Sequence, residues 1–280
     1  MKRMKVRKKQ LLRLISYLVA ILISIIWLIP IVSTIFISFK TEKEIMMEGA
    51  WTIPKTLHLD TYVNLWLEIK SYFINSLVVT IPAAVLSVFV ASLGAYAFAR
   101  KKFSGNNVIF MFLLGGMLIP AISCVVPVFL LIKKLALYNT YLAQILVHIS
   151  FSMPFCVFML RNFFITIPLE LDDAARIDGC SELNIILKII IPLAMPGIVT
   201  LMGFQFIWIW NNLIWGLILT TGKSVQPIMV GILRLKGSHS IAWNIQCAGV
   251  LISMLPPLFI FLILQKNLFK ALAMQSGIKG

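Results

Sequence analysis

The sequence predicts an all-α integral membrane protein with six transmembrane helices. Of its 280 residues, 60% are hydrophobic and only 12% are charged, and the mean hydropathy is +0.96. Soluble domains carry roughly 25% charged residues, so this chain has about half the charge that a water-facing surface requires. Six long stretches also lack Lys, Arg, Asp and Glu, and each is long enough for a helix to cross the hydrocarbon core, which takes about 20 residues.

The uncharged stretches give the order of the expected helices. They are residues 14–39, 71–99, 103–132, 135–160, 189–222 and 237–265. The first is too long for the core of a signal peptide, so we expect it to remain as a span. We expect the fifth helix to begin near Pro196, because Pro192 and Pro196 break the helix before it. Residues 1–13 form a basic N-terminal segment, and residues 14–280 form one six-helix domain.

The basic residues predict the orientation of the chain. If the N-terminus is cytoplasmic, seven Lys and Arg lie in the N-terminal segment, three in the turn 100–102, three in the segment 161–188 and three after the last stretch. Those sixteen compare with nine on the opposite side. Because cytoplasmic loops carry the excess of Lys and Arg, both termini are predicted to be cytoplasmic in the cell membrane.

The sequence argues against several classes of function. The charge of +15 is scattered among apolar stretches and forms no basic face interleaved with aromatic residues, so nucleic-acid binding is not expected. Ion-coupled carriers need ionisable groups inside the membrane, and the six stretches contain no Lys, Arg, Asp or Glu. The four cysteines and three histidines are dispersed, so we expect no catalytic residue, no metal site and no cofactor. An ion channel remains an alternative on hydrophobicity alone.

Energy for transport is expected to come from another chain. The segment Gly222-Lys223-Ser224 has the last residues of a phosphate-binding loop, but Leu217 stands where its first glycine would be. It is therefore no Walker A motif.

The segment 161–192 contains five of the ten acidic residues. Pro168 suits the first turn of a helix, and the acids that follow would lie near the positive end of its dipole. Gly179 is placed to end that helix in the left-handed conformation, and Ser181 can cap a second helix that returns to the membrane.

These residues resemble a known family. Asp173-Ala174-Ala175, Gly179 four residues later and Ile191-Pro192 beyond it resemble the "EAA" loop of binding-protein-dependent ABC importer permeases. The string from Pro168 to Gly179 is similar to the carbohydrate branch, of the maltose-permease type. The turn from Gly94 to Gly105 and the tail 277–280 also resemble that branch. Asp173 stands where the family usually has glutamate.

The resemblance implies a type I ABC importer permease fold and a set of partners. These are a second permease subunit, a cytoplasmic ATPase dimer and an extracellular or periplasmic solute-binding protein. The loop 161–192 would dock on the ATPase as a coupling helix. The residues to which the resemblance assigns this role are Glu170, Asp173, Ala174, Ala175, Asp178 and Gly179. The implied cargo is a sugar or oligosaccharide, with a non-sugar solute as the alternative.

Two further segments are candidate contact sites. Phe204, Trp208, Asn211 and Trp215 follow helical spacing, and such a stripe either lines a sugar path or packs against other helices. The segment 40–70 mixes four lysines with five acids. It either meets the external binding protein or lies on the membrane as an amphipathic helix.

Overall fold

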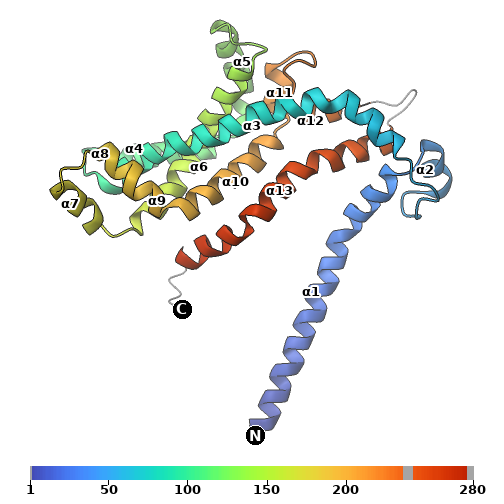
Figure 1. Ribbon diagram of the computed structural model, residues 1–280, viewed down its shortest axis with the longest axis horizontal. Helices are drawn as coiled ribbons and strands as arrows, with labels where there is room; N and C mark the ends of the chain where they lie inside the picture. Colours follow the sequence, from blue (N-terminus) through green and yellow to red (C-terminus); the bar gives the residue numbers. More distant parts are fainter. Residues whose placement is uncertain (1, 236–241, 276–280) are drawn as a thin grey trace. The chain divides into compact units, whose positions relative to one another are not determined.

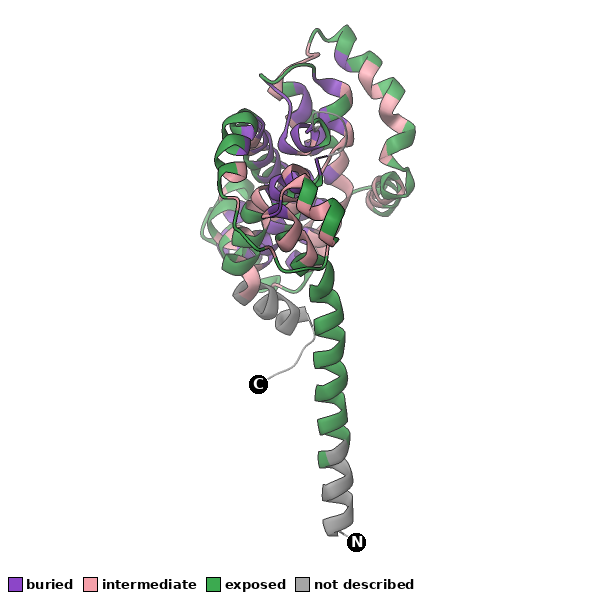
Figure 2. Ribbon diagram, turned by 90° about the vertical axis from the view of Figure 1, so that its right-hand side faces the viewer, coloured by how far each residue is buried: buried purple, intermediate pink, exposed green. Residues whose placement is uncertain are grey.

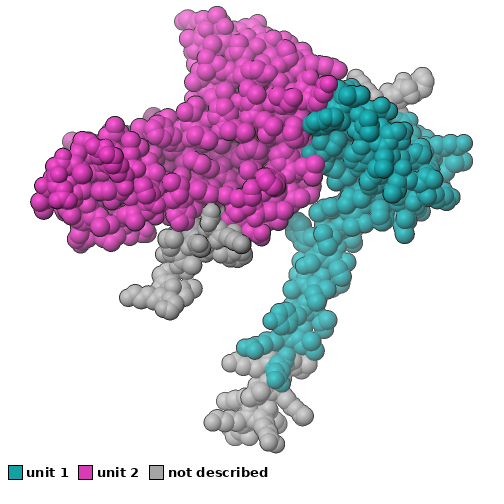
Figure 3. Space-filling view, in the orientation of Figure 1, with its two compact units in different colours: residues 1–68, 235–252 teal, residues 69–234, 253–280 magenta. Residues whose placement is uncertain are grey.

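The computed structural model describes residues 2–235 and 242–275, and the side chains of residue 10, residues 12–235 and residues 242–265. All regular structure in this described part is helical (Figure 1). The tail 277–280, which contributed to the family resemblance, lies outside it. The chain divides into two compact units, residues 1–68 with 235–252 and residues 69–234 with 253–280 (Figure 3).

The described helices agree with the six expected spans when each bent pair counts as one span. Four are long and apolar enough to cross a membrane: α1 (Lys2–Ser38), α3 (Asp60–Arg100), α6 (Tyr141–Ile165) and α13 (Trp243–Gln275). Two more candidates are helix pairs that bend sharply, by 93° and 81°. All-helical structure and a multi-pass membrane protein are therefore confirmed.

The first bent pair occupies the third uncharged stretch. It comprises α4 (Asn106–Gly115) with a 3-10 turn (Gly116–Leu118), then a second 3-10 turn (Ala121–Cys124) with α5 (Val125–Lys134). The bend of 93° falls at Ile119-Pro120, where proline cannot donate a backbone hydrogen bond. Residues 118–120 are exposed at this corner.

The second bent pair starts at Glu182, before the fifth uncharged stretch, and continues into it. It comprises α8 (Glu182–Ile185), a π-helical segment (Ile186–Ile190) and α9 (Ile191–Leu193), followed by α10 (Met195–Trp210). The break of 81° falls at Ala194, between the two prolines. Helix α10 thus begins where the prolines predicted. It ends at Trp210, well before residue 222, and two short helices follow: α11 (Ile214–Leu219) and α12 (Ile228–Leu233).

The unit of residues 1–68 and 235–252 is built around the end of α1. Helix α1 is exposed over residues 12–32 (Figure 2), and its last turns are partly buried, with Ser38 fully buried. After it, α2 (Glu42–Glu48) starts with a capping box, in which Thr41 and Glu44 satisfy each other's backbone N–H groups. The buried Lys40 donates to the Gly49 carbonyl at 2.9 Å and to Thr52 Oγ1 at 2.6 Å. These bonds hold the loop after α2 and show that part of the segment 40–70 is a folded cap.

The core of the second unit joins α3, α6, α8 and α10. Small and aliphatic side chains from these helices are buried together, and they include Ala91, Leu160, Ile185 and Leu201. Ala175 of α7 (Glu170–Ile177) also lies in this core. The short helix α7 is therefore packed on the membrane helices along one side.

Polar side chains tie the other end of this unit to the loop before α12. Asn75 Nδ2 donates to the carbonyls of Lys223 and Gln226, each at 2.9 Å. Tyr141 donates to Asn75 Oδ1 at 2.6 Å, and Gln144 donates to the Val225 carbonyl at 3.1 Å. These bonds fix the loop on α3 and α6.

Candidate functional site

The candidate site is the segment from α7 to α8, which has the predicted helix–glycine–helix form. Gly179 has φ +78°, and the Cys180 N–H donates to the Ala175 carbonyl at 2.9 Å. This six-residue closure past a left-handed glycine is a Schellman motif. Ser181 then accepts from the Asn184 N–H and caps α8. Both predicted ends are confirmed, although α7 begins at Glu170 and leaves Pro168 just before it.

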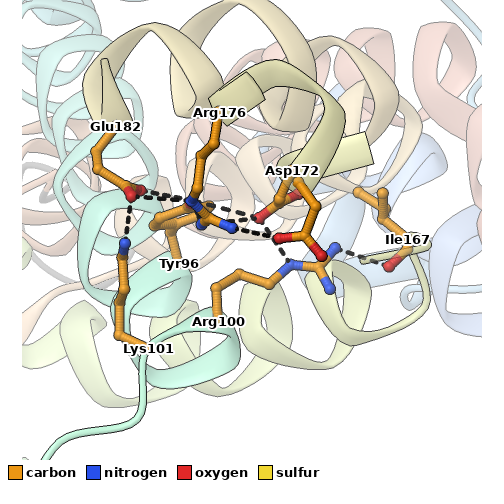
Figure 4. Close-up of polar contacts among 8 residues, drawn as sticks. Tyr96, Arg100, Lys101, Ile167, Asp172, Arg176 and Glu182 are labelled. Atoms are coloured by element: carbon orange, nitrogen blue, oxygen red, sulfur yellow. Dashed lines mark hydrogen bonds and ion pairs between the residues drawn. The ribbon is translucent and has the colours of Figure 1, made fainter. Parts of the chain in front are cut away.

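A buried ion pair fixes α7 to the end of α3. Arg100 Nε lies 3.6 Å from Asp172 Oδ2, and the two side chains are only 2% and 1% exposed (Figure 4). Arg100 also donates through Nη2 to the Ile167 carbonyl at 2.7 Å, in the turn before α7. One guanidinium therefore holds both the helix and its entry turn.

Glu182 gathers a second set of contacts (Figure 4). Its carboxylate accepts from Lys101 Nζ, from Arg176 Nε at 3.2 Å and from the Tyr96 hydroxyl at 2.9 Å. The Tyr96 hydroxyl also lies 3.3 Å from Asp172 Oδ2, and it has one proton for the two carboxylates. The first turn of α8 is thus linked to both α3 and α7.

These contacts lower the pKa of the Glu182 carboxyl group. Glu182 lies outside the apolar stretch 189–222. The hydrogen bond from Lys101, with those from Arg176 and Tyr96, lowers the pKa of Glu182 to about 2. Opposite charges and donated hydrogen bonds stabilise the ionised carboxylate.

The predicted coupling residues divide between two faces of α7. Asp173 is 70% exposed and accepts from Arg176 Nη1 at 2.8 Å, and Ala174 is exposed beside it. Glu170, Asp178 and Gly179 are also exposed. Ala175 faces the core, so of the two alanines only Ala174 leaves the backbone open to an approaching surface.

The aromatic stripe does not form one continuous helical face. Phe204 and the 73% exposed Trp208 lie on the outer side of α10, and Asn211 caps its end. Trp215 lies on the separate helix α11 and is only 2% exposed, because its ring packs against Phe151 and the buried residues around Val147. The structure therefore brings three of the four residues together and excludes Trp215.

The residues that hold the loop were not among the predicted site residues. Tyr96 lies near the end of the second uncharged stretch, Arg100 and Lys101 follow it, and all three were assigned only to the turn between two spans. Asp172 was assigned only to the helix dipole. One sequence signal could have predicted the buried side of α7. Asp172 and Ala175 are three positions apart, so they lie on the same side of the helix, and both are buried.

Taken together, the helices and the loop define a multi-pass membrane protein. Its long apolar helices carry, at one end, a short charged helix that is attached to them on one side and exposed on the other.

The comparisons identify the family. The sequence profile of the "Binding-protein-dependent transport system inner membrane component" family matches residues 2–274, and the chain belongs to this family. It is 31% identical over 268 residues to the probable ABC transporter permease protein YurM of Bacillus subtilis, covering 95% of this chain and 87% of that protein. It is 33% identical over 281 residues to the arabinooligosaccharides transport system permease protein AraQ of Halalkalibacterium halodurans, covering 98% and 100%.

A solved structure gives the same fold. A crystal structure of a bacterial ABC transporter involved in the import of the acidic polysaccharide alginate matches with a TM-score of 0.78 at 22% identity, over 91% of this chain and 96% of that one. Because the chain belongs to this family and is more than 30% identical to ABC permeases, it is a permease subunit of an ABC importer, as the resemblance of the loop implied. It is a non-catalytic membrane component.

Proposed function

We propose that this subunit carries a sugar or oligosaccharide across the cell membrane, paired with a second permease subunit and driven by a separate cytoplasmic ATPase dimer. The name of the AraQ relative, which is an arabinooligosaccharide transport permease, supports the sugar assignment. The family description supports delivery by an external solute-binding protein.

The open face of α7 is the proposed docking surface for the ATPase. It carries Glu170, Asp173, Ala174 and Asp178, and Ile177 beside them is 87% exposed. A large apolar side chain surrounded by acids in a water-facing loop suits a protein partner with an apolar pocket and basic rim. On the opposite face, Asp172 and Ala175 attach the same helix to the core, so a force on the open face acts on α3 and α6.

The orientation follows from the same assignment. If α7 meets a cytoplasmic ATPase, the turn 100–102 and both termini lie on the cytoplasmic side, which agrees with the sixteen-to-nine distribution of basic residues. Residues 1–13 are then a basic cytoplasmic segment, and residues 14–280 are the permease domain with its coupling loop at 161–192.

The proposed solute path uses the outer face of α10. Phe204 and Trp208 expose aromatic rings, and Asn211 adds an exposed amide whose Nδ2 donates to the Ile207 carbonyl at 2.9 Å. Aromatic rings stack on the C–H faces of sugars, and an amide can bond their hydroxyl groups. Trp215 has no part in this path because it is buried.

A size series at Ala174 tests the docking proposal. Ala174 is exposed, so Ala174→Trp is expected to leave insertion and permease pairing intact but to abolish ATPase binding by steric obstruction. Ala174→Ser is the matched small control and should bind the ATPase as the wild type does. Co-purification of the ATPase and solute uptake in vesicles measure the effect. Normal uptake by the Ala174→Trp variant would refute the docking surface.

A further inference from the structure

A cavity of about 540 Å³ opens between the end of α3, the start of α4 and α6. Its lining includes Lys101, Lys102, Phe103, Asn106, Asn107 and Arg161. It lies at the short turn where the uncharged stretch 71–99 ends and the stretch 103–132 begins. The cavity is therefore at the level where membrane helices meet lipid headgroups.

The cavity carries an excess of positive charge. Lys101 is paired with Glu182, but among the described residues no carboxylate lies within ion-pair distance of Lys102 or Arg161. Arg161 is held in place, since its guanidinium lies 4.4 Å from the centre of the Phe110 ring and Nε donates to the Phe98 carbonyl at 3.3 Å. Two uncompensated cations thus border one hollow.

The beginning of α4 lies at the same hollow. Gly105 precedes the helix with φ +82°, the Asn106 N–H donates to the Phe103 carbonyl at 3.2 Å, and no side chain caps the N–H groups that follow in this turn. Asn106 and Asn107, the first two residues of this ten-residue helix, line the cavity. Uncapped N–H groups and the positive end of a helix dipole favour an anion.

An apolar face continues from the cavity along α4. Val108, Met111 and Phe112 are spaced at three and four positions on one side of the helix, and all three are exposed. Phe103, at the rim of the cavity, is also exposed. A free phosphate ion would contact none of these side chains, whereas acyl chains would lie along them.

We propose that this cavity binds the phosphate headgroup of an anionic membrane phospholipid, with the acyl chains along the exposed face of α4. Basic pockets between membrane helices are suited to such headgroups. The inference goes beyond transport and coupling, because it concerns a lipid site that neither of them requires.

The test uses the whole transporter, purified with its partner subunits, and titrates phosphatidylglycerol or phosphatidylcholine by native mass spectrometry. Phosphatidylglycerol should bind more tightly than phosphatidylcholine. Lys102→Gln removes one cation and should weaken phosphatidylglycerol binding about fivefold. Lys102→Arg should retain it, and Lys188→Gln, an exposed lysine outside the cavity, should leave it unchanged.

Three results would overturn the proposal. Equal affinity of wild type and Lys102→Gln for phosphatidylglycerol would show that the lipid does not bind in this cavity. Displacement of the lipid by equimolar inorganic phosphate would make it a small-anion site. Binding to the permease pair but not to the assembled transporter would mean that the ATPase covers the cavity. Because lipid binding is measured without uptake, its failure would leave the proposed coupling function untouched.

Discussion

Arg100 and Asp172 form an ion pair that is almost completely buried, with Nε and Oδ2 3.6 Å apart. Asp172→Ala leaves the guanidinium buried without its carboxylate, and we expect a loss of about 3–5 kcal/mol in the free energy of unfolding. Chemical unfolding in mild detergent measures this loss. The double variant Arg100→Met/Asp172→Leu should recover most of it, since replacing a whole buried pair by apolar residues is often close to neutral.

The neighbouring acid is the matched control for that experiment. Asp173 is 70% exposed and pairs with Arg176 at the surface, so Asp173→Ala should change stability by less than about 1 kcal/mol. If Asp173→Ala proved as destabilising as Asp172→Ala, burial would not be what distinguishes the two pairs.

Substitution of Gly179 should affect coupling through the backbone conformation alone. Its φ is +78°, and a side chain at this position would meet no atom within 4 Å. Gly179→Val should therefore fold and insert, but the turn would be strained by about 1–2 kcal/mol. We expect α7 to shift and uptake per ATP hydrolysed to fall.

The control at this position is Gly179→Asn, because asparagine tolerates left-handed conformations. Uptake and ATP hydrolysis measured together in vesicles separate the two variants. Equal coupling in both would show that the left-handed turn is not required.

Glu182 predicts a dependence on pH. Its pKa in the folded chain is about 2, against an ordinary value of 4.5, because Lys101, Arg176 and Tyr96 stabilise its ionised form. The carboxylate thus contributes stability that is fully present above pH 4.5 and is lost as the pH falls toward 2. The thermal midpoint of the wild type should fall more steeply over this window than that of Glu182→Gln, and parallel curves would contradict the assignment.

Two tryptophans on α10 predict opposite results. Trp208 is 73% exposed, so Trp208→Ala should leave stability nearly unchanged and alter solute selectivity if this face lines the path. Trp210 is buried, stacks on Phe206 and donates to the Ser253 carbonyl at 2.9 Å. Trp210→Ala should cost about 3–5 kcal/mol.

For both variants, chemical unfolding measures stability, and competitive uptake of different sugars measures solute selectivity. Loss of permease pairing in Trp208→Ala, with unchanged selectivity, would assign this face to packing between subunits instead of the solute path.

Much of the fold follows from local chemistry. The prolines around Ala194 mark the start of α10 because proline restricts the backbone and cannot donate a hydrogen bond. Gly179 marks the end of α7 because glycine adopts the left-handed conformation of that turn at little cost. The expectation of one helical stripe from Phe204 to Trp215 was wrong, because α10 ends at Trp210. The Asn211-Asn212 pair at this break is uncharged, so a search for charge-free stretches does not detect it.

The attachment of α7 could not be predicted. Arg100 and Asp172 are far apart in the sequence, and each occurs among other charged residues that remain exposed. Only the packing of α7 against α3 selects Asp172 for burial and leaves Asp173 in water. Burial of Ala175 has the same origin.

The corner at residues 118–120 limits where lipid can touch this chain. The backbone there leaves the helical pattern in the middle of an apolar stretch, and its side chains are exposed. Hydrocarbon offers no hydrogen bonds, so irregular backbone is tolerated at membrane depth only beside protein or water. In the assembled transporter this corner must therefore contact a neighbouring subunit or a water-filled channel, and lipid does not cover the chain there.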